Sequence, residues 1–161
     1  MTPRLAIIVL LLAACSAESE PAPASTAGEG GTMAGADGAL PATFATVKLV
    51  FGGGGSIMTC AAAPCHGVGG VAPPSDPLEL PTNDDELLYT NLLSYVSKAC
   101  NDTKLVEPGD PARSALLTIL RGPCGMTPRM PYGCSEEAGD CIPDDYVAAV
   151  AEWIANGAPR Q

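Results

Sequence analysis

The sequence predicts a mostly α-helical fold, in which a small domain with long Gly- and Pro-rich loops is stapled by disulfide bonds and preceded by a disordered tether. Three observations lead to this fold class. Four stretches place apolar residues at helical spacing between helix start and stop residues, whereas strand patterns are weak throughout. The chain of 161 residues contains 18 Gly and 16 Pro, which favour loops. It has only 4 Tyr, 2 Phe and 1 Trp, so a stable core needs cross-links or a cofactor.

The first two predicted helices span residues 43–51 and 84–99. The first ends at the four glycines of residues 52–55, which break a helix. The second begins with acidic residues and carries Lys98 in its last turn, which suits the helix dipole. Their apolar faces are Phe44, Val47 and Val50 (or Phe51) in the first helix, and Leu88, Leu92, Tyr95 and Val96 in the second.

The third predicted helix is capped by Asp110, takes Pro111 as its first helical residue and ends at Gly122. The fourth begins at residue 143 or 144 and ends at residue 156, where a glycine follows it. Their apolar faces are Leu116, Leu117, Ile119 and Leu120 in the third helix, and Val147, Val150 and Ile154 in the fourth.

Residues 1–14 have the pattern of a secretory signal peptide. Residues 1–4 are basic, and the apolar run 5–12 is shorter than the roughly 20 residues that span a bilayer. Residues 12–15, Leu-Ala-Ala-Cys, resemble the lipobox of bacterial lipoproteins. The resemblance implies that Cys15 is acylated and anchors the chain in a lipid bilayer. The alternative is an ordinary secreted protein that has a cysteine near its cleavage site.

We expect residues 15–40, which begin with the lipidated cysteine, to form a flexible linker, because small and polar residues dominate them without apolar periodicity. Residues 41–161 then form the folded domain. Ser16 rather than an aspartate comes directly after the lipidated cysteine, which by the sorting tendency of bacterial lipoproteins favours the outer membrane. The expected location is the bacterial cell envelope, lipid-anchored and either periplasm-facing or at the outer membrane.

The chain carries a formal net charge of −10, with 18 Asp and Glu against 8 Lys and Arg. This balance disfavours nucleic acid as a partner, because phosphates need a basic surface. The negative charge can steer the protein toward a basic redox partner, or it can serve solubility alone. With 1 His, the chain cannot build a site from several imidazoles.

The segment from Cys60 to His66 carries the pattern of covalent haem attachment. In c-type haem proteins a His directly follows the second of two nearby cysteines, which bind the haem vinyl groups while the imidazole binds the iron. Here four residues separate Cys60 from Cys65, whereas two is the commonest spacing. Two alternatives remain: a disulfide between these cysteines with His66 as a bystander, or a zinc site completed by another cysteine. A thiol oxidoreductase would use Cys-x-x-Cys, which is absent.

From about Phe44 to its end, the chain resembles a class I c-type cytochrome domain of the kind found in exported lipoproteins of Gram-negative bacteria. Residues 106–116 look like the family's V-x-PGDP-x-x-S-x-L segment. Arg129-Met130-Pro131 resembles its Met-Pro loop, and residues 153–158 resemble its closing W-I-x-x-G-A helix. The resemblance implies a small cytochrome c-like helical domain.

The resemblance also implies one covalent haem c. Cys60 and Cys65 would hold it through thioethers, His66 would be the proximal ligand of the iron and Met130 the distal ligand. Met126 and Met58 remain rivals for the distal position. We further expect the haem to fill the core among apolar side chains: Leu88, Leu92, Leu116, Leu120, Val147, Val150, Trp153 and Ile154.

Seven cysteines are an odd number, and lipidation of Cys15 leaves six, which suits an oxidising compartment. Once two of these hold haem, four remain and three pairings are open. We favour Cys100–Cys124, which closes a loop across the third helix, and Cys134–Cys141, which closes an acidic excursion before the fourth. Placed on both sides of Met130, these bridges would also limit the motion that detaches its sulfur from iron.

We therefore expect a membrane-anchored, single-haem electron-transfer protein that is not an enzyme and whose redox partner is an unidentified protein. The alternative is a haem-free, disulfide-stabilised envelope lipoprotein that acts as a binding or scaffold module. A haem peroxidase would need an open distal position or a second attachment motif, and the sequence has one motif.

Overall fold

The computed structural model describes residues 39–52, 60–62, 65–69 and 77–161. The chain divides into two units, Met1–Gly31 and Thr32–Gln161, and all the described residues belong to the second. The predicted signal peptide, Cys15, Met58 and the linker up to residue 38 lie outside the described residues. Among the helices that the structure describes, none is both long and apolar enough to cross a membrane.

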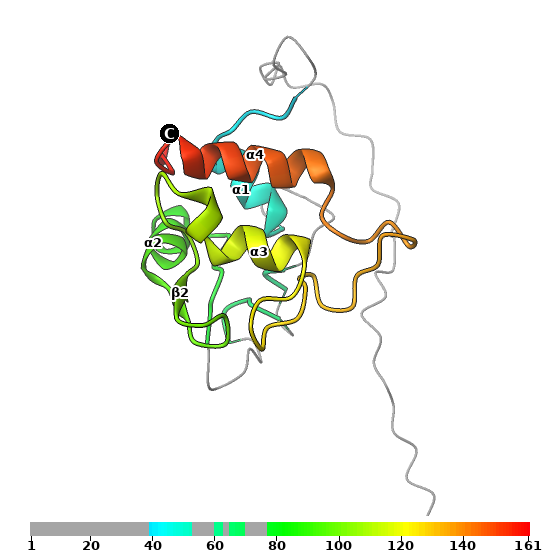
Figure 1. The fold of residues 1–161 in the computed structure, drawn as a ribbon. Helices are drawn as coiled ribbons and strands as arrows, with labels where there is room; N and C mark the ends of the chain where they lie inside the picture. The colour runs from blue at the N-terminus through cyan, green and yellow to red at the C-terminus, as the bar shows by residue number, and fades with distance from the viewer. Residues whose placement is uncertain (1–38, 53–59, 63–64, 70–76) are drawn as a thin grey trace, which may run out of the picture. The chain divides into compact units, whose positions relative to one another are not determined.

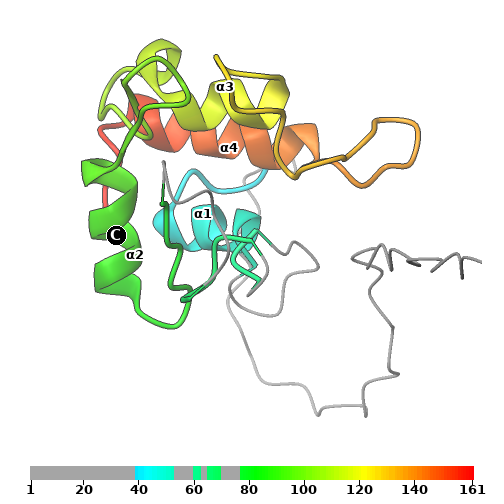
Figure 2. The same cartoon turned by 90° about the horizontal axis from the view of Figure 1, so that it is seen from below.

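Helices α1 (Phe44–Val50) and α4 (Asp144–Ala155) pack against each other (Figure 1). Helix α1 begins where the Thr43 hydroxyl accepts a hydrogen bond from the Thr46 N–H, as expected of an N-cap threonine. Both helices lie where the sequence predicts them. Helix α4 also contacts α3, and Figure 2 shows α3, α4 and α1 one beside the next with α2 at their end.

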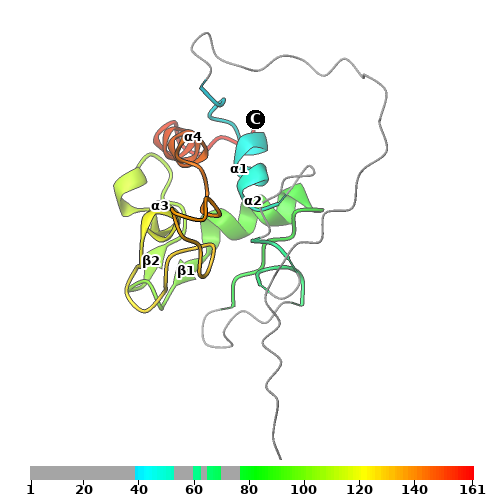
Figure 3. The ribbon, with the colours of Figure 1, turned by 90° about the vertical axis from the view of Figure 1, so that its right-hand side faces the viewer.

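Helix α2 (Asp85–Ser94) is capped by Asp84, whose carboxylate accepts from the Leu87 N–H at 3.0 Å. The prediction that this helix continues to residue 99 is wrong, because Tyr95 is extended and Val96–Ser97 form strand β1. Strand β1 pairs antiparallel with β2 (Thr103–Lys104), and this hairpin lies below α3 in Figure 3.

The turn of this hairpin explains why the helix stops. Asn101 and Asp102 have φ values of 57° and 53°, a left-handed conformation that these two residue types tolerate. The Leu105 N–H then donates to the Tyr95 carbonyl at 2.9 Å. Pairing with a later segment therefore outweighs the helical pattern of residues 95–99.

The predicted third helix is two elements, the 3-10 turn η2 (Pro111–Arg113) and helix α3 (Ala115–Arg121). Ser114 between them is extended, and its hydroxyl donates to the Asp110 carbonyl and accepts from the Glu107 N–H, both at 2.9 Å. A side chain that bonds the backbone on both sides competes with a continuous helix.

These interruptions overturn the predicted fold class. About 36% of the described residues are helical, in four α-helices with a two-stranded sheet, and long loops make up much of the remainder. The described part of the chain is thus not a mostly α fold and is not clearly cytochrome c-like. The prediction failed because strand pairing ends the second helix early and Ser114 interrupts the third near its start.

The buried core joins α1, α4, α3 and α2. Phe44 of α1 belongs to this core, with its ring centroid 5.3 Å from that of Tyr89, edge to face, and 6.2 Å from that of Trp153. The eight side chains expected to surround haem all belong to this core and pack among protein side chains: Leu88, Leu92, Leu116, Leu120, Val147, Val150, Trp153 and Ile154.

The C-terminal residues fold back onto this core. The Trp153 indole Nε1–H donates to the Pro159 carbonyl at 2.6 Å, and the Tyr89 hydroxyl donates to the Ala158 carbonyl at 2.8 Å. Arg160 forms an ion pair with Glu86 at the start of α2. The polar groups of the two aromatic side chains are thereby satisfied where they enter the apolar interior.

Candidate functional site

Among the described residues, two cysteines are unpaired, Cys60 and Cys65, near the start and end of the predicted attachment segment. Cys60 is half-buried against the core, and Cys65 is exposed. The Ala61 N–H donates to the Phe51 carbonyl at 3.0 Å, which joins the segment to the end of α1. The alternative disulfide between Cys60 and Cys65 is not formed in this structure.

Backbone hydrogen bonds close the segment into a tight turn. The Cys65 and Gly67 N–H groups donate to the Ala62 carbonyl at 2.8 and 3.1 Å, and the His66 N–H donates to the Cys60 carbonyl at 3.0 Å. A Cβ atom at Gly67 would lie 2.5 Å from the Ala61 carbonyl oxygen. Only glycine fits this close approach, and the turn brings His66 beside both cysteines.

The His66 ring is oriented by Leu78. Its Nδ1 lies 3.1 Å from the Leu78 carbonyl oxygen, which can only accept a hydrogen bond. Nδ1 therefore carries the proton, and the Nε2 lone pair of the neutral ring is left for a metal ion. A metal-binding histidine usually makes such a bond through its other nitrogen. The Leu80 N–H donates to the His66 carbonyl at 2.7 Å and holds the two segments together.

Burial raises the pKa of the Cys60 thiol to about 11, and the neighbouring Cys65 contributes in the same direction. Cys60 is therefore a neutral thiol near pH 7 in the chain without a bound group. Among the described residues, no group of three or more His, Cys, Asp or Glu side chains is placed to hold a metal ion.

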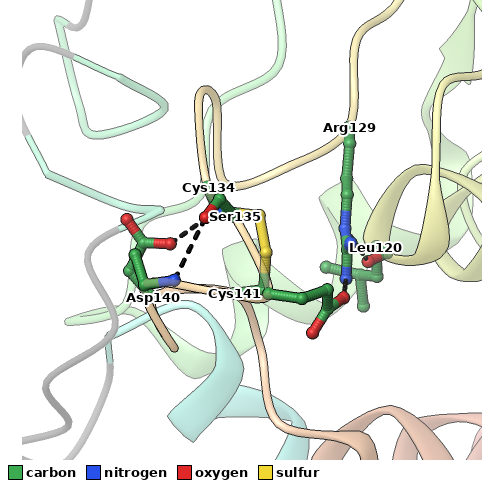
Figure 4. The surroundings of a disulfide bond; sticks show 8 residues. Leu120, Arg129, Cys134, Ser135, Asp140 and Cys141 are labelled. Carbon is green, nitrogen blue, oxygen red and sulfur yellow. Dashed lines mark hydrogen bonds and ion pairs between the residues drawn. A yellow bond between two sulfur atoms is a disulfide. The ribbon is translucent and has the colours of Figure 1, made fainter.

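The other four cysteines of this part of the chain form the disulfides that the spacing favours. Cys100 pairs with Cys124, and Cys134 pairs with Cys141. Figure 4 shows the second bond, with Asp140 directed toward Ser135 across the base of the loop. The Ser135 N–H donates to the Asp140 carboxylate at 2.7 Å, so this short loop is closed twice.

Met130 is half-buried on the segment between the two disulfides, and its N–H donates to the Ile119 carbonyl at 2.8 Å. The rival Met126 is 85% exposed. Among the described residues, no hydrogen bond or ion pair joins the segment that contains Met130 to residues 60–69. The structure thus brings Cys60, Cys65 and His66 together, whereas it makes no such link for Met130.

Three residues with a clear structural role at these sites are missed by the sequence analysis: Gly67, Leu78 and Arg129. A glycine directly after the Cys-His pair could have indicated a tight turn. The Leu78 carbonyl carries no sequence pattern, because any residue can supply it. The sequence pattern marks Arg129 only as a neighbour of Met130, yet its side chain reaches both Leu120 and Glu136.

Comparisons with known protein families, with curated proteins and with solved structures find no match to this chain.

Proposed function

We propose that this chain is a single-haem electron-transfer protein in which Cys60 and Cys65 bind one haem c covalently and His66 is the proximal ligand. The observation that carries the proposal is the hydrogen bond from His66 Nδ1 to the Leu78 carbonyl, next to two free thiols. These donors suit haem c: two thiols for thioethers, and one neutral imidazole with an available nitrogen. When bound, haem iron supplies a one-electron Fe(III)/Fe(II) couple.

The protein's own part in this function is to hold and orient the imidazole. The Leu78 carbonyl fixes the tautomer and the ring orientation of His66, so that Nε2 is the nitrogen available to iron. The turn closed at Gly67 keeps the imidazole at a constant position relative to the cysteines. The elevated pKa of Cys60 keeps its thiol protonated, which protects the unloaded protein from oxidation at this position.

We assign the distal position to Met130. A neutral thioether stabilises Fe(II) and raises the reduction potential relative to a second imidazole. Met126 is less suited because its side chain is almost fully exposed, whereas Met130 is half-buried. The sequence contains 1 His, so a second imidazole would have to come from another molecule.

The proposal includes the anchor and the partner expected from the sequence. Acylated Cys15 would hold the protein at a bilayer of the bacterial envelope. The formal charge of −10 would favour a redox partner with a basic surface. A lipid-anchored carrier that exchanges electrons with such a protein needs no catalytic group of its own.

The test is covalent loading of the full chain, expressed in a bacterium that matures c-type cytochromes. We expect an intact mass about 616 Da above that of the same mature chain without haem, and a pyridine haemochrome spectrum of a c-type haem. Replacing both Cys60 and Cys65 with Ser should abolish the added mass. The matched control replaces Cys134 and Cys141 with Ser and should retain it.

An unmodified mass in the wild-type chain, with the maturation system shown to load a known cytochrome, would refute the proposal. That result would favour the alternative, a haem-free envelope lipoprotein. His66→Ala separates attachment from ligation, because it should keep the thioethers and lose the spectrum of a six-coordinate iron.

A further inference from the structure

The segment that contains Met130 lies against the end of α3. The last four carbonyls of an α-helix have no partner within the helix. Two of those in α3 are satisfied by this segment: the Met130 N–H donates to the Ile119 carbonyl at 2.8 Å, and Arg129 Nε donates to the Leu120 carbonyl at 3.1 Å. A positive guanidinium at this end also complements the helix dipole.

Arg129 has a second partner on the disulfide-closed loop. Its Nη2 lies 2.5 Å from a carboxylate oxygen of Glu136, within the loop that Cys134 and Cys141 close. The view in Figure 4 shows Arg129 directed toward Leu120 beside this disulfide. The rigid guanidinium thus serves two acceptors through two different nitrogens, which the single ammonium group of lysine does less well.

The exposed fractions of the side chains indicate which of the two Arg129 contacts, with Leu120 or with Glu136, is the stronger. The Arg129 side chain is 27% exposed, whereas that of Glu136 is 73% exposed. An ion pair with an exposed carboxylate contributes little by itself. The bond to the Leu120 carbonyl is part-buried and satisfies a group that the helix leaves open. Replacing Arg129 should therefore loosen this segment more than replacing Glu136.

We propose that Arg129 is a positioning residue for Met130: it fixes the backbone of Met130 between α3 and the disulfide-closed loop, so that the thioether is held in one place as the distal ligand. This inference rests on the proposed function for its last step alone. Fixing Met130 is a property of the polypeptide and can be measured without haem. Arg129 itself does not touch the iron.

The first experiment measures hydrogen exchange of the Met130 amide in the haem-free full chain. We expect exchange about tenfold faster in Arg129→Gln, because a charged hydrogen bond to the helix end is lost. Glu136→Gln should accelerate it about threefold. The matched control, Glu137→Gln, changes the neighbouring carboxylate and should leave the rate unchanged. Unchanged exchange at Met130 in Arg129→Gln would overturn the inference.

Exchange of the Trp153 amide in α4 shows whether each variant is folded. If the Trp153 amide of Arg129→Gln also exchanges faster, that variant is not properly folded, and Arg129→Lys is tested in its place. Lysine keeps the positive charge and loses only the forked geometry of the guanidinium. We then expect a smaller acceleration at Met130, of about threefold. If the Met130 amide of a folded Arg129→Lys chain exchanges at the wild-type rate, the two guanidinium nitrogens are not needed to fix Met130. That result would contradict the inference.

The second experiment uses the haem-loaded protein. The Fe–S(Met) charge-transfer band should weaken in Arg129→Gln and recover partly in Arg129→Lys, while the Glu137→Gln spectrum stays that of the wild type. An undiminished band in Arg129→Gln would overturn the positioning of the thioether. If even the wild-type chain carries no haem, the proposed function fails, and the exchange experiment still decides whether Arg129 fixes Met130.

Discussion

The helical core and the attachment turn are held in different ways. The core of α1, α2, α3 and α4 consists of apolar side chains that are almost completely buried, and its stability comes from their removal from water. The described residues of the turn, 60–62 and 65–67, add only the partly buried Cys60 and Ala61 to this core and are held by backbone hydrogen bonds, one glycine and the contact between His66 and Leu78. Substitutions in the core should therefore change global stability, whereas those in the turn should change the geometry of the donors.

The largest effect should come from Trp153→Ala in the core. The indole is fully buried, contacts Phe44 and donates to the Pro159 carbonyl. Its removal should lower the free energy of unfolding by about 3–5 kcal/mol, measured by urea denaturation. Tyr132→Ala, at a side chain 81% exposed, is the control and should change stability by less than about 0.5 kcal/mol. Similar losses in both variants would mean that the core does not dominate stability.

The next effect is a pH dependence that belongs to the attachment turn. The folded state raises the pKa of Cys60 from an ordinary value of 9.0 to about 11, so folding favours the protonated thiol. The stabilisation is fully present below pH 9 and is lost as the pH rises through 11, with a total of about 3 kcal/mol.

This pH dependence is measured by denaturation of the haem-free chain between pH 8 and 11. Cys60→Ala should remove most of the fall in stability over this range. The exposed Cys65 provides the comparison, because Cys65→Ala removes only the smaller contribution that its charge makes to the pKa of Cys60. An equal fall in stability in wild type and Cys60→Ala would contradict the assigned burial.

The most local effect should come from Gly67→Ala, which acts on the turn and not on the core. The new Cβ would lie too close to the Ala61 carbonyl, so the turn must shift, at a cost of about 1–3 kcal/mol. Because His66 adjoins this residue, we expect its ring resonances and its bond to Leu78 to change in NMR spectra. Gly122→Ala is the matched control, since nothing lies within 4 Å of its added Cβ. Unchanged His66 resonances in Gly67→Ala would show that the turn tolerates the side chain.

The local elements of the fold could be predicted where one residue and its near neighbours decide the outcome. Asp110, the predicted cap, accepts from the Arg113 N–H at the start of η2. Thr43 and Asp84, each predicted as the first residue of its helix, are the caps of α1 and α2. The helical pattern of residues 95–99 is misleading, because a hairpin to residues 103–104 competes with it. Strand pairing joins separate segments of the chain, and the helical spacing within one segment does not reveal it. The predicted fold class was wrong for this reason.

In the candidate site, too, local features could be predicted from the sequence, whereas contacts between separate segments could not. The spacing of Cys60, Cys65 and His66 is a local pattern, and the structure keeps these residues in one turn. The partner of His66 is a backbone carbonyl 12 residues later, which no side-chain pattern indicates. Contacts of Arg129 with Leu120 and Glu136 likewise depend on how the loop returns to α3.

The folded-back C-terminal residues have a practical consequence for engineering. A truncation after Gly157 would remove the carbonyls of Ala158 and Pro159 and leave the Tyr89 hydroxyl and the Trp153 indole without acceptors inside an apolar environment. Affinity tags or reporter fusions should therefore be appended beyond Gln161 and should not replace the residues before it. The last turn of the chain belongs to the domain as fully as any helix does.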